Sequence, residues 1–429
     1  MKKISLPLLL LSTHALASGG YDKHALWSAR SIALGGAVAS SVSQSEALLF
    51  NPAGISGKEL SVHYAGYWGY LKSPLNSSNS TRTTDDPVFV PALVGSFQLT
   101  DKLALGFGYY GVAGLDIAYK DVNYGRVDSA LQNYNKDYYA NLAVAEYSLG
   151  VSYKLNELLR FGFALRGQNV KGAFQQSQII RDSGSNAVLG VQTAKFSDLE
   201  DSKLGSYRAG IQFMDESKTW GLGATYRSVV KFDAEGKLSG EFAGGTASGS
   251  GGVITPSVGS DAIVSAQLPQ KFDLDGHYHI NANNTVFLGY TWIEYKLSSK
   301  LGIKGTLDGT PVADVNQYWH NMHEYKLGFE NRSFEFAAYR FGYALTSQVT
   351  NAKYSSANSA TPGNFHHFSF GLGKNITERL SFDGALEYYY SVGRGKSEAS
   401  DNGTVAVNSV GGNSMSEVYG VVAGLKYQY

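Results

Sequence analysis

The sequence has no cysteine among its 429 residues. This absence excludes disulfide scaffolds, thiolate metal sites and cysteine nucleophiles, and it suits a chain that resides in an oxidising compartment. The fold must therefore be held together by backbone pairing and by burial of side chains.

An excess of one charge is also lacking, because 36 lysines and arginines balance 36 aspartates and glutamates. If a leader with its two lysines is removed, 34 basic residues face 36 acidic ones and the net charge is −2. A chain without a clustered basic face is not suited to nucleic acid, so we expect no nucleic-acid partner.

A third absence is a long hydrophobic run beyond the first residues of the chain. A membrane-spanning helix needs about 18 or more consecutive apolar residues. We therefore exclude spanning by α-helices. Proline is scarce as well, with 9 residues against 50 glycines, 29 tyrosines and 21 phenylalanines, and this composition favours many strands with aromatic bands.

The N-terminus has the three parts of an export signal. Two lysines follow the initiator methionine, the stretch from Ile4 to Leu11 is mostly apolar, and Ala15-Leu16-Ala17 fits a cleavage site. The alternative, a short buried helix, is disfavoured by Pro7 and by the position at the chain start. We expect residues 1–17 to be a cleaved signal peptide.

Alternation of apolar and polar residues with a period of two recurs along the chain and predicts strands with one apolar face. Near the C-terminus the apolar face comprises Tyr419, Val421, Ala423, Leu425, Tyr427 and Tyr429. Fourteen such segments begin near Leu60, Phe89, Lys102, Asn141, Leu159, Gly205, Lys218, Val264, Asn284, Met322, Ser333, Gly363, Arg379 and Ser416. The number is even, as bacterial membrane barrels require.

The connections between these segments alternate between tight turns and long polar loops. Tight turns are expected at 100–101, 156–157, 215–217, 281–284, 331–332 and 375–378. Long loops are expected at 71–88, 115–140, 173–204, 233–263, 299–321, 348–362 and 394–415. Short turns at one end and long loops at the other are typical of an outer-membrane barrel, whereas a soluble β-sandwich has no reason to sort its connections in this way.

The segment before the first strand does not alternate, and it contains apolar residues such as Trp27, Ile32 and Leu48 that do not suit a solvated tail. We expect it to pack inside the barrel. The sequence thus predicts an all-β, fourteen-stranded antiparallel transmembrane β-barrel at 58–429, with an N-terminal hatch at 18–57 in its lumen.

The stretch SARSIALGGAVASSVSQSEALLFNPAGIS resembles the hatch of the FadL-type outer-membrane transporters of long-chain fatty acids and other hydrophobic compounds. Later stretches such as LPQKFDLDGHYHINANNTVFLGYTWIEY are similar to strand pairs of that family, so the resemblance covers most of the mature chain. The chain departs from the family in ending with Tyr429, where a terminal Phe is usual. It also has Ser43-Gln44-Ser45-Glu46 where the family often has a pair of acids.

The resemblance implies a monomeric barrel, plugged by its hatch, that takes up hydrophobic molecules by passive diffusion and releases them through a lateral gap in the wall. Long-chain fatty acids are the expected ligands, and aromatic hydrocarbons are the alternative. The implied location is the bacterial outer membrane, in contact with its lipids, and no cofactor is expected.

A lateral gap requires a local break in strand pairing. Gly111 and Gly114, which follow the apolar alternation of the third strand, are candidates for a kink there, with a simple strand end as the alternative. We expect Asn51 to hold the hatch backbone at this gap, Pro52 to fix its direction, and Ala53 to complete the motif.

Arginines on the lumen face are candidates to bind a ligand carboxylate: Arg166, Arg208, Arg227 and Arg340. The alternative for each is a structural ion pair with a lumen acid such as Asp273, Glu324, Asp383 or Glu387. His277 and His279 share the lumen face at a spacing that a metal could use, but no third ligand is apparent, so we predict no metal.

Three other functions compete with transport. An outer-membrane lipid enzyme would need a converging serine, histidine and acid, but no G-x-S-x-G motif occurs, and we predict no enzymatic activity. A structural or adhesive barrel with binding loops is compatible with the pattern. An open porin is disfavoured by the hatch.

Overall fold

The structure is a computed structural model that describes residues 28–73, 80–83, 88–125, 127–182, 184–249, 251–355, 360–396 and 412–429. The expected signal peptide at 1–17 and the first part of the expected hatch lie outside the described residues. Among the residues described, no helix is long and apolar enough to cross a membrane.

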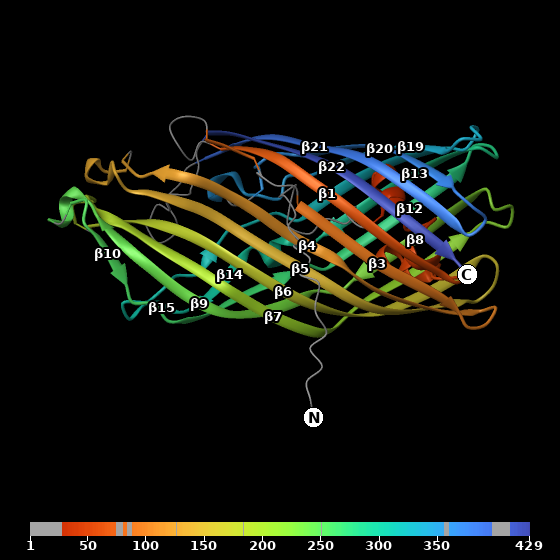
Figure 1. The fold of residues 1–429 in the computed structure, drawn as a ribbon, viewed down its shortest axis with the longest axis horizontal. Helices are drawn as coiled ribbons and strands as arrows, with labels where there is room; N and C mark the ends of the chain where they lie inside the picture. The colour runs from red at the N-terminus through yellow and green to blue at the C-terminus, as the bar shows by residue number, and fades with distance from the viewer. Residues whose placement is uncertain are drawn as a thin grey trace, which may run out of the picture.

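Fourteen antiparallel strands form a closed barrel, which confirms the predicted fold and strand number (Figure 1). Closure is made by β1 and β22, which pair from Glu59 with Gln428 to Lys72 with Met415. In order, the wall consists of β1 (Glu59–Ser73), β3 (Val88–Gln98), β4 (Leu103–Asn123), β5 (Asn135–Lys154), β6 (Leu159–Arg181), β7 (Val188–Met214), β8 (Trp220–Arg227) continued by β9 (Val230–Gly244), β11 (Asp261–Leu268) continued by β12 (Lys271–His279), β13 (Asn284–Ile293), β18 (Met322–Asn331), β19 (Ala338–Thr346), β20 (Phe365–Asn375), β21 (Leu380–Gly395) and β22 (Gly412–Gln428).

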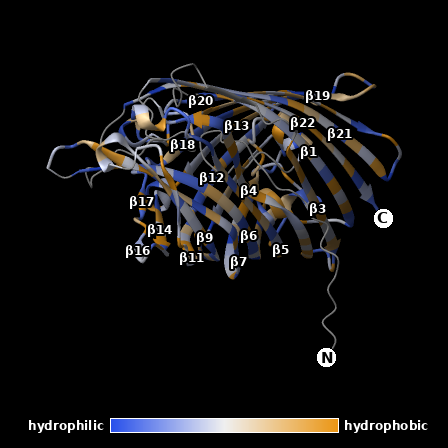
Figure 2. Cartoon of the chain, turned by 60° about the vertical axis from the view of Figure 1, so that its left-hand side comes forward, coloured by the Kyte–Doolittle hydropathy of each residue, from blue (hydrophilic) through white to orange (hydrophobic). Residues whose placement is uncertain are grey.

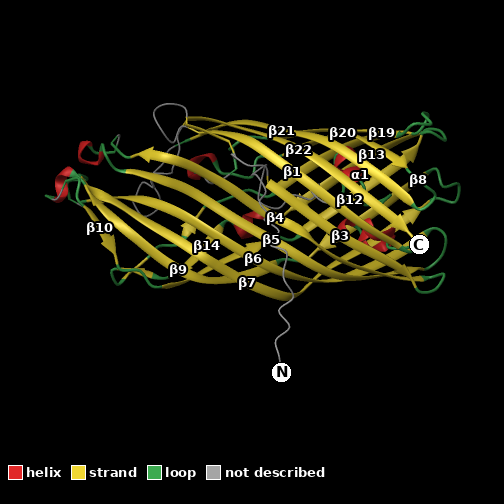
Figure 3. Cartoon of the chain, in the orientation of Figure 1, coloured by secondary structure: helices red, strands yellow, loops and turns green. Residues whose placement is uncertain are grey.

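Shorter elements decorate the end of the barrel opposite the C-terminus. They are β2 (Ser80–Thr83), β10 (Ile254–Ser257), β14 (Lys300–Lys304), β15 (Thr306–Leu307), β16 (Thr310–Pro311), β17 (Val315–Asn316), η3 (Ser129–Leu131), η4 (Thr246–Ser248), η5 (Tyr295–Ser298) and η6 (Ala352–Tyr354). The N-terminal segment contributes α1 (Ala29–Ala33), η1 (Gln44–Glu46), α2 (Ala47–Phe50) and η2 (Pro52–Gly54), which lie at the other end (Figure 3).

The strands alternate in hydropathy along their length, as Figure 2 shows by its bands of orange and blue. The predicted outward face of β22 is confirmed, since Val421, Leu425 and Tyr427 are exposed while Val418 and Val422 are buried. Outward side chains such as Leu149 are 60% exposed, which a wall in contact with lipid tails explains.

Most of the predicted tight turns are present. The Leu99 amide donates to the Leu103 carbonyl (2.9 Å), and the Ile376 amide donates to the Leu380 carbonyl (2.8 Å). One turn prediction is wrong, because the β18–β19 connection is not a tight turn at 331–332 but extends to Ala337. Phe334 and Phe336 therefore belong to this connection and not to the strand.

Three of the predicted long loops are also wrong. Residues 115–140, 173–204 and 233–263 are largely strand, because β4, β5, β6, β7 and β9 continue far beyond the membrane band. The physical reason is that both faces of a strand become polar outside the lipid, so alternation fades although backbone pairing continues.

Candidate functional site

The segment from Ser28 to Gly57 lies inside the ring of strands, which confirms that the N-terminal region packs in the lumen (Figure 3). Its fully buried apolar residues include Ile32, Leu34, Val38, Val42, Leu48 and Leu49. They form one cluster with inward residues of the wall, including Val88, Val90, Val94, Val418 and Val422. We call this segment the hatch.

Wall glycines allow the hatch backbone to approach the strands closely. A Cβ atom added at Gly342 would lie 2.2 Å from the Gly35 nitrogen, and one at Gly223 would lie 2.2 Å from the Ala39 oxygen. Gly35 itself has a φ of 63°, a conformation that favours glycine. The hatch therefore fits only against a wall without side chains at these points.

Polar side chains of the wall satisfy the hatch backbone. The Asp275 carboxylate accepts a hydrogen bond from the Ala39 amide (2.7 Å), and Gln212 donates to the Val42 carbonyl (2.9 Å). Lys326 donates to the Gly36 carbonyl (3.2 Å) and pairs with Asp275 (2.7 Å). A buried irregular backbone needs such partners, because water is excluded from it.

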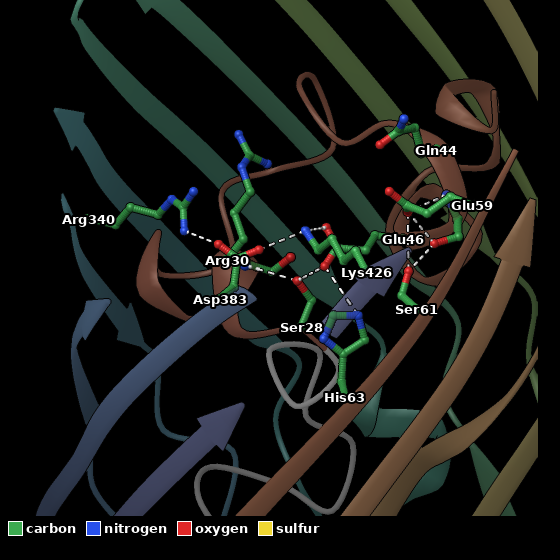
Figure 4. A network of polar contacts seen from close by, with 12 residues as sticks. Ser28, Arg30, Gln44, Glu46, Glu59, Ser61, His63, Arg340, Asp383 and Lys426 are labelled. Atoms are coloured by element: carbon green, nitrogen blue, oxygen red, sulfur yellow. Dashed lines mark hydrogen bonds and ion pairs between the residues drawn. The ribbon is translucent and has the colours of Figure 1, made fainter. Parts of the chain in front are cut away.

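Glu46 of the hatch is the centre of a buried charge network (Figure 4). Its carboxylate accepts from the Ser28 hydroxyl (2.6 Å) and lies 2.9 Å from the Lys426 ammonium and 3.3 Å from His63 Nε2. Lys426 also pairs with Asp383 (2.9 Å). Burial alone would raise the pKa of Glu46, but Lys426 and His63 hold this pKa below its ordinary value.

The Asn-Pro-Ala motif lies against β6 and β7. The buried Asn51 side chain donates to the Ala39 carbonyl (2.8 Å) and to the Ile211 carbonyl of β7 (2.9 Å), and it accepts from the Ala53 amide (3.1 Å). Pro52 opens η2, and a Cβ atom added at Gly162 of β6 would lie 2.1 Å from the Ala53 nitrogen. The motif thus fixes the path of the hatch at this side of the barrel.

The other two predicted gate residues lie elsewhere, on β4. Gly111 and Gly114 are both buried, and the β4–β5 register shifts between Gly111 and Ala113, which leaves Val112 as an extra residue in a β-bulge. The structure therefore does not bring Asn51 to Gly111 and Gly114. The Leu48 side chain of the hatch would lie 3.1 Å from a Cβ atom added at Gly108, which precedes the bulge on β4.

Pairing between β3 and β4 stops at the same level as the bulge. The two strands are paired from Gln98 with Ala104 to Ala92 with Tyr110. Beyond this point, β3 is paired only with β1 as far as Val88, and β4 is paired only with β5. In the described residues, β3 and β4 form no further pairs with each other. Inward residues at this wall gap are Val88, Val90, Val112, Ala113 and Val144, all buried.

The four predicted ligand arginines all face the lumen and are at least 95% buried. Arg166 forms an ion pair with Glu146, and Arg208 lies 3.6 Å from the same carboxylate and donates to the Leu48 carbonyl (2.5 Å). A Glu146 carboxylate shared by two arginines was not expected from the sequence. The alternation of inward and outward side chains along a strand predicts that a residue faces the lumen, but it does not predict which residues lie beside it there.

The other two arginines are likewise held by protein acceptors. Arg227 donates to the Pro269 carbonyl (3.1 Å), while Arg340 donates to Glu330 (2.6 Å) and to Asp383 (2.5 Å). Of the predicted acid partners, Asp383 pairs with Arg340.

The two lumen histidines have different partners. His277 Nδ1 lies 2.9 Å from the Ser40 hydroxyl of the hatch, and His279 Nδ1 lies 2.8 Å from the Thr285 hydroxyl. No group of three or more metal-ligating side chains is found within the described part of the chain.

A cavity of about 510 Å³ lies between the hatch and the wall at the end where the C-terminus lies. Its lining includes many charged residues, among them Arg30, Glu46, Arg340, Lys374, Asp383 and Lys426. A hydrophobic molecule leaving along the barrel axis would have to cross these charges.

The model of the family described as "Outer membrane protein transport protein (OMPP1/FadL/TodX)" matches residues 8–429. The chain belongs to the OMPP1/FadL/TodX family. As a member of this family it is an outer-membrane transport protein for hydrophobic compounds, and not an enzyme.

Solved structures of similar proteins share the fold of this OMPP1/FadL/TodX protein. A Pseudomonas aeruginosa FadL homologue has 14% identity and a TM-score of 0.74, with 94% of this chain and 98% of that chain covered. The Pseudomonas putida toluene transporter TodX has 15% identity and a TM-score of 0.70, with 95% and 99% covered. CymD, a monoaromatic hydrocarbon channel, has 14% identity and a TM-score of 0.67, with 93% and 96% covered. No curated protein matches the chain.

Proposed function

We propose that the protein is a channel for passive uptake of hydrophobic molecules, which leave the lumen sideways through the wall gap between β3 and β4. The observation that carries this proposal is the end of pairing at Ala92 and Tyr110 beside the Val112 bulge. The lumen side of this gap is apolar, whereas the axial exit is lined by charges. An apolar ligand is more stable against the apolar side of the gap than against the charged axial exit.

The neutralised arginines favour uncharged ligands such as monoaromatic hydrocarbons. A carboxylate would compete with Glu146 for Arg166, or with Glu330 and Asp383 for Arg340. TodX is described as a toluene transporter and CymD as a monoaromatic hydrocarbon channel. Long-chain fatty acids, the ligands expected from the sequence, are the second candidate.

Burial of a long alkyl chain contributes a large binding free energy, which supports fatty acids as the second candidate. At about 0.8 kcal/mol per buried methylene, a dozen methylenes contribute roughly 10 kcal/mol before ordering costs. A charge-assisted hydrogen bond to the carboxylate adds roughly 1.5–3 kcal/mol. The tail thus dominates binding, and the head group decides orientation.

The test is uptake of a labelled monoaromatic hydrocarbon and a labelled long-chain fatty acid by cells that lack their own transporters. Deletion of Val112 removes the extra residue of the bulge and lets β4 pair regularly, so we expect uptake to fall. The control is Val112→Ala, which keeps the bulge. Equal uptake by the deletion variant and the control would refute lateral release at this gap.

We further propose that the signal peptide is cleaved before Ser18 and that the barrel is monomeric. The first proposal rests on the Ala15-Leu16-Ala17 pattern, and the second on apolar outward side chains of the wall, such as Leu149 and Val421, which suit contact with lipid. Native mass spectrometry of the protein purified from outer membranes measures the mature mass and the subunit number together.

A further inference from the structure

The cavity at the C-terminal end of the barrel reaches the rim of the wall. Its lining includes Glu46 and Lys426 inside the barrel as well as Phe336, Lys374 and Phe382 at the rim. Lys374 of β20 and Phe382 of β21 are cross-strand partners, and Phe382 is 38% exposed on the face of the wall that meets lipid. The cavity of about 510 Å³ therefore has a charged part inside the barrel and an apolar part at the rim.

The connection between β18 and β19 forms the outer edge of this cavity. It carries two exposed aromatic side chains, Phe334 at 60% and Phe336 at 63%. The Phe334 ring lies edge-on to the Tyr339 ring, with centroids 5.0 Å apart, and Tyr339 lies 6.5 Å from the outward Phe370 of β20. The connection thus folds over the lipid-facing side of the strands. Aromatic side chains in such a place mark the membrane–water interface.

Lys374 is a cation without an acidic partner in the described part of the chain. Its ammonium lies over the Phe336 ring, 4.2 Å from the centroid. The other cations of the lining lie 3.7 Å or less from carboxylates: Arg30, Arg332 and Arg340 near Glu330, and Lys426 near Glu46 and Asp383. A cation–π contact positions the Lys374 ammonium but leaves its N–H donors available for an anion.

Glu335 is the acid that complements Lys374. It precedes Phe336 in the chain, lines the same cavity and is exposed. Among the described residues it forms no ion pair. The rim of the cavity therefore presents one cation and one carboxylate that the other charges of the lining do not neutralise, next to exposed aromatic rings.

A phospholipid head group matches this combination of charges and apolar surface. Its phosphate accepts hydrogen bonds from an ammonium such as that of Lys374, and basic pockets at the membrane surface bind lipid head groups in this way. Its acyl chains suit the outward rings of Phe336 and Phe382, which a soluble anion would leave exposed. Short turns mark the periplasmic end of such barrels, so the lipid that can reach this rim belongs to the periplasmic leaflet.

We propose that the cavity at the rim binds a phospholipid of the periplasmic leaflet whose head group carries a phosphate and an ammonium, as in phosphatidylethanolamine. Lys374 binds the phosphate, Glu335 accepts a hydrogen bond from the lipid ammonium, and the acyl chains lie along Phe336 and Phe382. The bound lipid ties the β18–β19 connection to the membrane. The site goes beyond the channel function and does not depend on it.

The first test measures lipid retention by the purified full-length barrel. Native mass spectrometry follows the binding of dioleoylphosphatidylethanolamine as it is added to the protein in a mild detergent. Lys374→Gln removes the ammonium, so we expect the dissociation constant of the first lipid to rise about tenfold, as for loss of one charge-assisted hydrogen bond. The matched control is Lys58→Gln. It removes another exposed ammonium that lies over a phenylalanine ring, 5.1 Å from the Phe97 centroid, but does not line the cavity. We expect its dissociation constant to stay within about twofold of the native value.

The second test varies the head group. Dioleoylphosphatidylglycerol has the phosphate and the same acyl chains but no ammonium, so we expect it to bind several-fold more weakly than dioleoylphosphatidylethanolamine. Glu335→Gln should remove most of this difference. Inorganic phosphate at millimolar concentration shares the anion but lacks acyl chains, and we expect it to leave the bound lipid in place.

Each contrary result overturns a stated part of the proposal. Equal lipid retention by Lys374→Gln and Lys58→Gln overturns the site as a whole. Displacement of the lipid by inorganic phosphate overturns a lipid as the occupant, because it identifies a site for a free anion. Equal binding of the two lipids by the native protein overturns the role of Glu335. Uptake through the wall gap is tested separately by the deletion of Val112.

Discussion

Charged side chains in the lumen mainly form ion pairs with one another. These pairs determine whether a residue stabilises the barrel or is available to bind a ligand. Arg166 and Glu146 are both fully buried, and Glu146 also lies near Arg208. A buried ion pair adds little net stability when it is intact, but loss of one partner leaves an uncompensated charge. We therefore assign the arginines first to the integrity of the barrel, and only then to a ligand.

Arg166→Met is expected to destabilise the barrel by about 3–5 kcal/mol, because Glu146 loses its nearest counter-charge in a dry environment. Urea unfolding in lipid vesicles measures the change. The double variant Arg166→Met with Glu146→Gln should recover most of this loss and keep fatty-acid uptake. Recovery of stability with complete loss of fatty-acid uptake would instead identify Arg166 as a head-group ligand.

Lys426→Met is expected to loosen the hatch around Glu46, because the ammonium at 2.9 Å is the nearest cation to that carboxylate. Amide hydrogen exchange at residues 46–50 should become about tenfold faster. The control is Lys374→Met, which removes an exposed ammonium that lies over the Phe336 ring and does not contact the hatch. Equal exchange in the two variants would show that the network does not anchor the hatch.

Single residues also show what the sequence can reveal and what it cannot. Alternation placed Arg166 and Arg340 in the lumen, because lipid outside and charge inside fix the parity of a strand. Their partners depend on the register between strands and on the strand tilt, and neither can be read from the alternation of apolar and polar residues. Glu146 is therefore absent from the predicted acid partners, although it is the most completely buried member of its group.

At the level of elements, the predicted strands are correct in number and begin within a few residues of the observed ones wherever lipid contacts them. Prediction failed beyond the membrane, where β4 to β7 continue as paired strands with two polar faces. It also failed to place the hatch motif. The Asn51 side chain donates to the Ile211 carbonyl of β7, because the path of a non-repetitive segment depends on tertiary contacts.

Seating of the hatch depends on bare glycine positions in the strands. Gly342→Ala would place a methyl group 2.2 Å from the Gly35 nitrogen, so we expect the hatch to be displaced from β19. Planar-bilayer recordings should then show larger ion conductance than the native protein. Gly302→Ala is the control, since its Cβ atom would meet its nearest neighbour at an ordinary 3.4 Å.

On the scale of the whole molecule, the barrel and the hatch share one apolar cluster, so the hatch is not a complete folding unit without the barrel. The wall alone is closed by backbone pairing between β1 and β22 and can stand without a filled lumen. Stability of the wall and closure of the channel are therefore separable properties.

Deletion of residues 18–57 tests this separation. The wall keeps all of its strand pairs, so we expect the truncated barrel to insert and to keep strand-rich circular dichroism. Its lumen, however, loses the apolar filling and exposes Lys326, Asp275 and Gln212, whose hatch partners are gone. Water and ions should then enter along the axis, and steady conductance should replace hydrophobic selectivity. An inserted barrel that stays electrically closed would show that the wall strands, and not the hatch, seal the lumen.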